Sequence, residues 1–131
     1  MIGHIQLVGC LLMALSLIHV FFPRYFKWKD DLKPLSLINR QMMYIHTFFL
    51  AFALLLLGLL CVFAADELTD TPLGKKLSYG FALFWTARLM VQFIGYHPSL
   101  WKGKKKETII HILFVILWIY ISAVFWMNAY Y

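Results

Sequence analysis

The chain has 131 residues, of which 63% are hydrophobic and 14% are charged, and its mean hydropathy is +0.76. This composition excludes an ordinary soluble domain, because such a domain carries about 25% charged residues. The net charge of +6 does not indicate a nucleic-acid partner, since the basic residues are divided between loops and form no single basic face. We therefore expect an all-α integral membrane protein surrounded by the lipid bilayer.

Four apolar segments are each long enough to cross about 30 Å of hydrocarbon as a helix. We place these spans at approximately 2–22, 42–65, 77–96 and 108–129. Three of them contain no Asp, Glu, Lys or Arg, and the third span is interrupted by Arg88 alone. The four prolines, whose rings disrupt helix interiors, lie outside these segments, at Pro23, Pro34, Pro72 and Pro98. The first segment lacks the basic start and cleavage site of a secretory signal, so we expect it to be retained.

The loops differ in charge, and this difference predicts the topology. Basic residues are concentrated in the loops at 23–41 and 97–107, whereas the middle loop carries three acidic residues and two lysines. Because basic loops are retained in the cytoplasm, we expect both termini on the non-cytoplasmic side. The expected architecture is an antiparallel up-down four-helix bundle in a bacterial inner membrane. Alternating aromatic and basic residues between Arg24 and Lys29 also allow a short interfacial helix in the first loop.

Three histidines are expected at a similar depth, about 5–8 Å from the cytoplasmic surface at 1.5 Å per residue. They are His19, His46 and His111, and each shares a helical stripe with small or polar residues, which predicts a protein-packed face. A lone membrane histidine is most often a hydrogen-bonded packing residue. Two on facing helices can instead supply the axial ligands of a b-type haem. For that alternative the preferred pair is His46 and His111, with His19 as a substitute and Arg40 near the propionates.

Arg88 is the most costly residue in the chain, because an arginine in the middle of a span costs at least about 2.5 kcal/mol. No span contains Asp or Glu, so other groups must meet its charge, and Gln92 is the nearest candidate, one helical turn further on. A quinone oxygen, a lipid phosphate, another anionic ligand or an acidic residue of a partner are the alternatives. Side chains lean toward the N-terminus of a helix, so we expect the reach of Arg88 toward the cytoplasm to be hindered.

Functional motifs are few. The sequence has no HExxH motif, no His-rich metal box, no phosphate-binding glycine loop, no nucleophile beside an obvious base and no carboxylate in a span. We therefore expect an accessory or scaffolding subunit that acts through a membrane protein partner or a homo-oligomer. Two alternatives remain open. One is a redox protein that binds b-type haem or quinone, and the other is an enzyme or carrier for a lipophilic anionic substrate.

Small and aromatic residues within the spans predict how the helices pack. Gly9, Gly58 and Gly80 should allow close helix contacts. Trp85 and Trp118 are expected to be core aromatics. For Cys10 and Cys61 we expect two apolar thiols rather than a disulfide.

Overall fold

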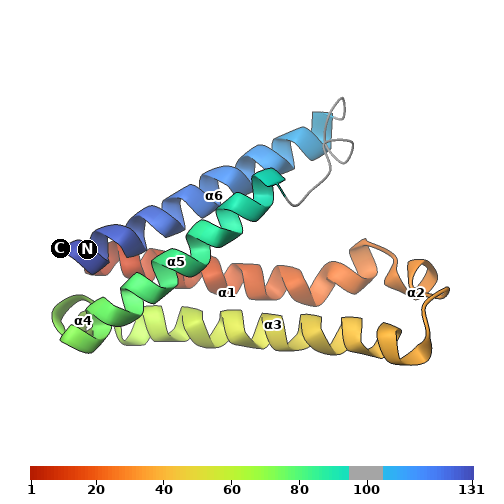
Figure 1. Ribbon diagram of the computed structural model, residues 1–131, viewed down its shortest axis with the longest axis horizontal. Coiled ribbons are helices and arrows are strands. Elements are labelled where there is room, and N and C mark those ends of the chain that lie inside the picture. Colours follow the sequence, from red (N-terminus) through yellow and green to blue (C-terminus); the bar gives the residue numbers. More distant parts are fainter. Residues whose placement is uncertain (95–104) are drawn as a thin grey trace. The chain divides into compact units, whose positions relative to one another are not determined.

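The computed structural model describes residues 1–94 and 105–131, and every regular element among them is a helix (Figure 1). Four helices are long and apolar enough to cross a membrane: α1 (Ile2–Tyr25), α3 (Leu37–Phe63), α5 (Pro72–Ile94) and α6 (Lys105–Tyr130). Two short helices, α2 (Trp28–Asp31) and α4 (Ala65–Asp70), lie in the connections. The all-α prediction with four apolar helices is confirmed, and these helices suggest a multi-pass membrane protein.

The described residues form two compact units. One consists of Gln6–Ala65 and contains most of α1 together with α2 and α3. The other consists of Met1–Ile5 and Asp66–Tyr131 and contains α4, α5 and α6. We call the first the α1–α3 hairpin and the second the α5–α6 hairpin.

Helix ends extend beyond the apolar segments because polar caps, rather than hydropathy, decide where a helix begins. Ser36 caps α3, since its hydroxyl accepts a hydrogen bond from the Asn39 amide at 3.4 Å. Thr71 caps α5 by accepting from the Gly74 amide at 2.9 Å, and Pro72 occupies the first helical position, where its missing N–H costs little. Pro23 also lies inside a helix, in the last turn of α1.

The α1–α3 hairpin is held by direct contact between helix backbones. A Cβ atom built on Gly9 would lie 2.7 Å from the Gly58 carbonyl oxygen, and one built on Gly58 would lie 2.8 Å from the Gly9 oxygen. Such an approach is open only to glycine, so the prediction for these two residues is confirmed. Two turns further along α1, the buried Ser16 hydroxyl donates to the Ala51 carbonyl at 2.6 Å.

A buried polar network stabilises the end of the α5–α6 hairpin at which α5 begins and α6 ends. The Asn128 side-chain amide donates to the Leu68 carbonyl at 2.9 Å and to the Ser78 hydroxyl at 2.6 Å. Lys75 Nζ donates to the Asn128 carbonyl at 2.7 Å. A Cβ on Gly74 would overlap the backbone of Glu67 and Leu68, so the α4–α5 turn requires glycine there. These contacts fix α4 and the start of α5 against the end of α6.

Candidate functional site

Arg88 lies on α5 in the half nearer the helix C-terminus, six residues before Ile94. Its Nη1 donates to Gln92 Oε1 at 3.4 Å, which confirms that Gln92, one turn further on, meets the guanidinium. That Arg88 is hindered from reaching toward the cytoplasm stays a prediction, because the side chain of Gln92 also leans toward the N-terminus of α5 and can meet the guanidinium there.

Gln92 is the centre of the cluster. This side chain is 7% exposed and connects α5 to two residues of α6. Its Oε1 also accepts a hydrogen bond from Trp118 Nε1 at 3.2 Å, and its Nε2 lies 2.8 Å from His111 Nδ1. Both the oxygen and the nitrogen of the amide therefore make contacts. They connect Gln92 to Arg88, His111 and Trp118 in one network.

Aromatic rings pack against one side of this network. The Arg88 guanidinium carbon lies 4.8 Å from the centre of the Trp118 ring, a cation–π contact. Trp118 in turn stacks on Trp85 of α5, with ring centroids 5.3 Å apart and planes 15° from parallel, and on Phe114 at 5.7 Å. Trp85 and Trp118 are 2% and 4% exposed, so the prediction of core aromatics is confirmed. The rings hold one side of the guanidinium away from water.

The two helices of this hairpin offer almost no negative charge. α5 contains no Asp or Glu, and α6 contains only Glu107, in its first turn. Gln92 and Trp118 supply a dipole and a π-face, which stabilise the guanidinium. The guanidinium thus lies on a helix that is long and apolar enough to cross a membrane.

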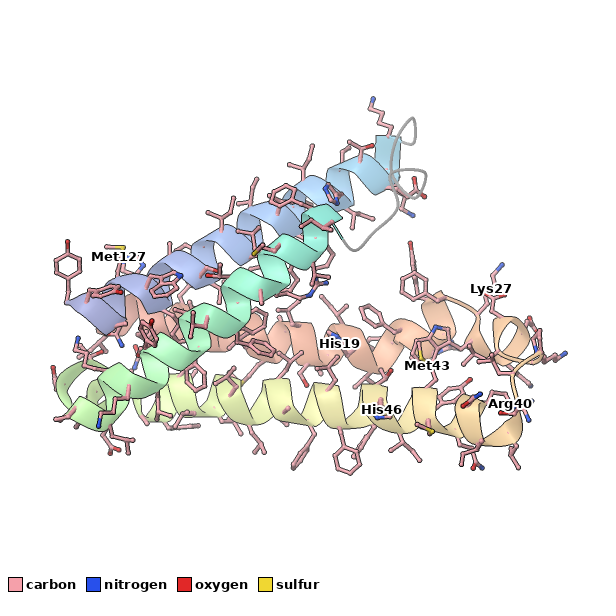
Figure 2. The ribbon with its side chains drawn as sticks, in the orientation of Figure 1. His19, Lys27, Arg40, Met43, His46 and Met127 are labelled. Carbon is pink, nitrogen blue, oxygen red and sulfur yellow. The ribbon has the colours of Figure 1, made fainter. Side chains whose placement is uncertain are left out.

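The other predicted site residues, His19, His46 and Arg40, belong to the α1–α3 hairpin, where Figure 2 labels all three. His19 Nδ1 lies 2.8 Å from the Leu15 carbonyl, and His46 Nδ1 lies 2.8 Å from the Met42 carbonyl. A carbonyl can only accept, so Nδ1 carries the proton in both rings. Each histidine thus bonds to its own helix, as expected for a packing histidine.

The two histidines of the preferred haem pair lie in different units, His46 in the α1–α3 hairpin and His111 in the α5–α6 hairpin. His46 is exposed, and it lies about 100° around α3 from the line of residues that contacts α1. The haem pairing stays a prediction. Most of the basic loop at 97–107 lies outside the described residues.

Trp118 was expected only as a core aromatic, and its role in the site was missed. A signal was present in the sequence, because Trp118 follows His111 by seven residues and so lies on the same face of α6. Two buried polar atoms lie close by in the chain and have no hydrogen-bond partner among the described residues, Trp85 Nε1 and Ser122 Oγ. Because buried polar atoms are usually hydrogen-bonded, these two are candidate contacts for water or a ligand.

We compared the chain with models of protein families, with curated proteins and with solved structures, and it matches none of them.

Proposed function

We propose that this protein binds an amphiphile with an oxygen-rich headgroup at the Arg88 cluster. The headgroup is a carboxylate, a phosphate or a quinone carbonyl, and the tail lies in the bilayer. This proposal develops the two ligand-binding alternatives drawn from the sequence. It assigns Arg88 the main contact and His111 a second contact.

The proposal includes a topology. The four long helices form an antiparallel bundle in a bacterial inner membrane, with the loops at 23–41 and 97–107 in the cytoplasm and both termini on the other side. The concentration of lysine and arginine in these two loops supports this orientation. Arg88 and His111, each six residues from the helix end beside residues 95–104, then lie about 9 Å from the cytoplasmic ends of their helices. A lipid headgroup can reach that depth.

One observation carries the proposal. A guanidinium lies on a helix that is long and apolar enough to cross a membrane, where it contacts the buried Gln92 side chain and the face of Trp118. Arginines at membrane depth are costly and are usually retained for a ligand or a partner. An anionic or carbonyl oxygen would be attracted to the guanidinium, and this attraction is strong in a region of low dielectric constant.

The test is to extract the protein in polymer-bounded lipid discs without detergent and to identify the bound amphiphiles by mass spectrometry. We expect one acidic lipid or quinone to be enriched over the bulk membrane. Arg88→Leu should reduce this enrichment at least about tenfold, as expected for loss of a charge-assisted contact. Arg24→Leu, which removes an exposed arginine in the last turn of α1, is the matched control and should leave it unchanged. Equal enrichment in wild type and Arg88→Leu would overturn the proposal.

A second candidate is the accessory or scaffolding role, in which a partner subunit or a second copy supplies a carboxylate to Arg88. Gly80 favours it. A Cβ built on this exposed residue of α5 meets nothing within 4 Å, so the close contact that glycine allows is not used among the described residues. The same discs distinguish the candidates. Loss of a co-purifying polypeptide in Arg88→Leu, with the lipids unchanged, would support the accessory role.

A further inference from the structure

We propose that one buried water molecule connects α5 to α6 through Trp85 Nε1 and Ser122 Oγ. Both atoms are buried, and neither has a hydrogen-bond partner among the described residues. Trp85 lies three residues before Arg88, nearer the middle of α5. The inference concerns a separate site and does not depend on a ligand at Arg88.

Buried side chains with a polar group recur at every seventh residue of α5, at Ser78, Trp85 and Gln92. A spacing of seven keeps them on one line of the helix, which is the line that faces a neighbour in left-handed helix packing. At both ends of this line the polar group is bonded to α6. Ser78 accepts from Asn128, and Gln92 accepts from Trp118. The middle member, Trp85, has no such bond among the described residues.

The register between the two antiparallel helices places Ser122 opposite Trp85. The rings of Phe81 and Phe125 are in contact, with centroids 5.3 Å apart, and a hydrogen-bonded pair lies three residues earlier on α5 and three later on α6. One residue forward on α5 thus corresponds to one residue back on α6. Four forward from Phe81 is Trp85, and four back from Phe125 is the residue before Ser122. The two levels therefore agree within about 1.5 Å along the axis.

Side-chain direction and size fit a small molecule between these two atoms. A helical side chain leans toward the N-terminus of its own helix, so the Trp85 ring is directed from the level of Trp118 toward that of Ser122. Ala82, one turn before Trp85, is completely buried, and Ser122 is 6% exposed. An alanine and a serine thus lie between two layers of aromatic rings, where small side chains can accommodate a water molecule.

Water has the hydrogen-bonding groups that this place requires. The indole N–H can only donate, so it needs an acceptor, whereas the Ser122 hydroxyl can donate or accept. A water molecule can accept from Trp85 and bond to Ser122 at the same time, and it can donate a remaining hydrogen to the second lone pair of a backbone carbonyl. Two buried polar atoms without partners would cost more free energy than ordering one water molecule does.

The first experiment detects the water at the indole. The chain has five tryptophans, and the ¹⁵N-indole signal of Trp85 is assigned by its loss in Trp85→Phe. In discs of deuterated lipid we expect magnetisation transfer from water to the Trp85 N–H. We expect none to the N–H of Trp118, which is buried and bonded to Gln92.

Substitutions at Ser122 test where the water lies. Ser122→Val replaces the hydroxyl with methyl groups that fill the space, so transfer to Trp85 should be lost. Ser122→Ala removes the hydroxyl without adding volume and should reduce the transfer at least about twofold, so it carries the test if Ser122→Val does not fold. Ala123→Val adds the same methyl groups at an exposed residue of the same turn, and as the matched control it should leave the transfer unchanged.

The second experiment measures the coupling between the two residues. In a titration with SDS, Ser122→Ala should shift the equilibrium about threefold toward the unfolded form, as for an average polar contact between membrane helices. Because the bridge also needs the indole N–H, the same substitution should have no further effect in a Trp85→Phe background.

The outcomes decide the inference without reference to Arg88. Absence of transfer from water to wild-type Trp85, or transfer that Ser122→Ala leaves unchanged, would overturn it. Transfer from the Ser122 hydroxyl alone would show a direct bond and would overturn it too, as would independent effects of the two substitutions on stability. Failure of Arg88→Leu to release an amphiphile counts against the proposed function only.

Discussion

The two hairpins pack their helices in different ways. α1 and α3 meet through Gly9 and Gly58, so their backbones touch, and the rings of His19 and His46 turn back onto their own helices. α5 and α6 meet through large side chains, with stacked indoles and a glutamine that connects the two helices. The first kind of contact brings two backbones together at small residues, whereas the second holds polar groups from both helices at one point. The candidate site is the one place where side chains of both helices form such a described polar cluster with an arginine.

The comparison also separates two kinds of membrane histidine. His19 and His46 each bond through Nδ1 to a carbonyl of their own helix, one turn away. His111 depends on a residue of another helix, so its state reports on the packing of the α5–α6 hairpin. A histidine that is coupled to a neighbouring helix is the better candidate for a functional role.

The largest effect is expected where the backbones touch. Gly9→Val places its Cβ at about the position that lies 2.7 Å from the Gly58 carbonyl oxygen, so the helices must separate. We expect the free energy of unfolding to fall by about 3 kcal/mol, the upper end of the range for an overpacked core. Denaturation by SDS in mixed micelles, followed by circular dichroism, measures the change.

Gly80→Val is the matched control for this substitution, because a Cβ there meets nothing within 4 Å among the described residues. Its unfolding curve should coincide with that of wild type. If Gly9→Val were equally stable, the contact between backbones could not be what holds α1 to α3.

A smaller effect is expected in the polar network at the other end of the second hairpin. Asn128 is completely buried, and Asn128→Ala removes the bonds to the Leu68 carbonyl and the Ser78 hydroxyl. We expect a loss of about 1–2 kcal/mol in the free energy of unfolding, as for polar contacts between membrane helices. Asn39→Ala, at an exposed asparagine of α3, should change it little. Equal values for the two variants would mean that the network contributes no stability.

The smallest effect is expected for the one side-chain hydrogen bond described between α1 and α3. Ser16→Ala removes the bond to the Ala51 carbonyl and should cost about 0.6 kcal/mol, the average for such bonds in a membrane protein. The same SDS titration measures it, with Ser36→Ala reporting the separate loss of a helix cap. A loss above that of Asn128→Ala would reverse the ranking and show that polar contacts dominate the first hairpin too.

The helices themselves were predictable because hydropathy and length decide them. Apolar segments of this length rarely occur as exposed loops or surface helices of soluble proteins, and the composition of the sequence predicted all four helices. Their ends were less predictable. α5 begins at Pro72 rather than near 77, because Thr71 and Pro72 form a helix start that resembles an ordinary turn in the sequence. α3 likewise begins at Leu37 rather than near 42, because the helix continues past the charged Arg40 that set the start of the predicted span.

The candidate site was predicted in part. Arg88 and Gln92 share one helix, so their contact follows from a spacing of four residues. The contacts of Gln92 with His111 and Trp118 join two helices, and a single sequence does not give the register between them. The tautomers of the histidines depend on atoms 2.8 Å away and could not be foreseen from the order of residues.

The position of Arg88 also bears on how the chain enters the membrane. α1 and α3 are more apolar than α5, and His19 and His46 each bond through Nδ1 to a carbonyl of their own helix. α5 is the least apolar of the four long helices, and the aromatic face that covers its guanidinium belongs to α6. We therefore expect the translocation machinery to hold α5 until α6 has been synthesised, and the two to leave it as a pair.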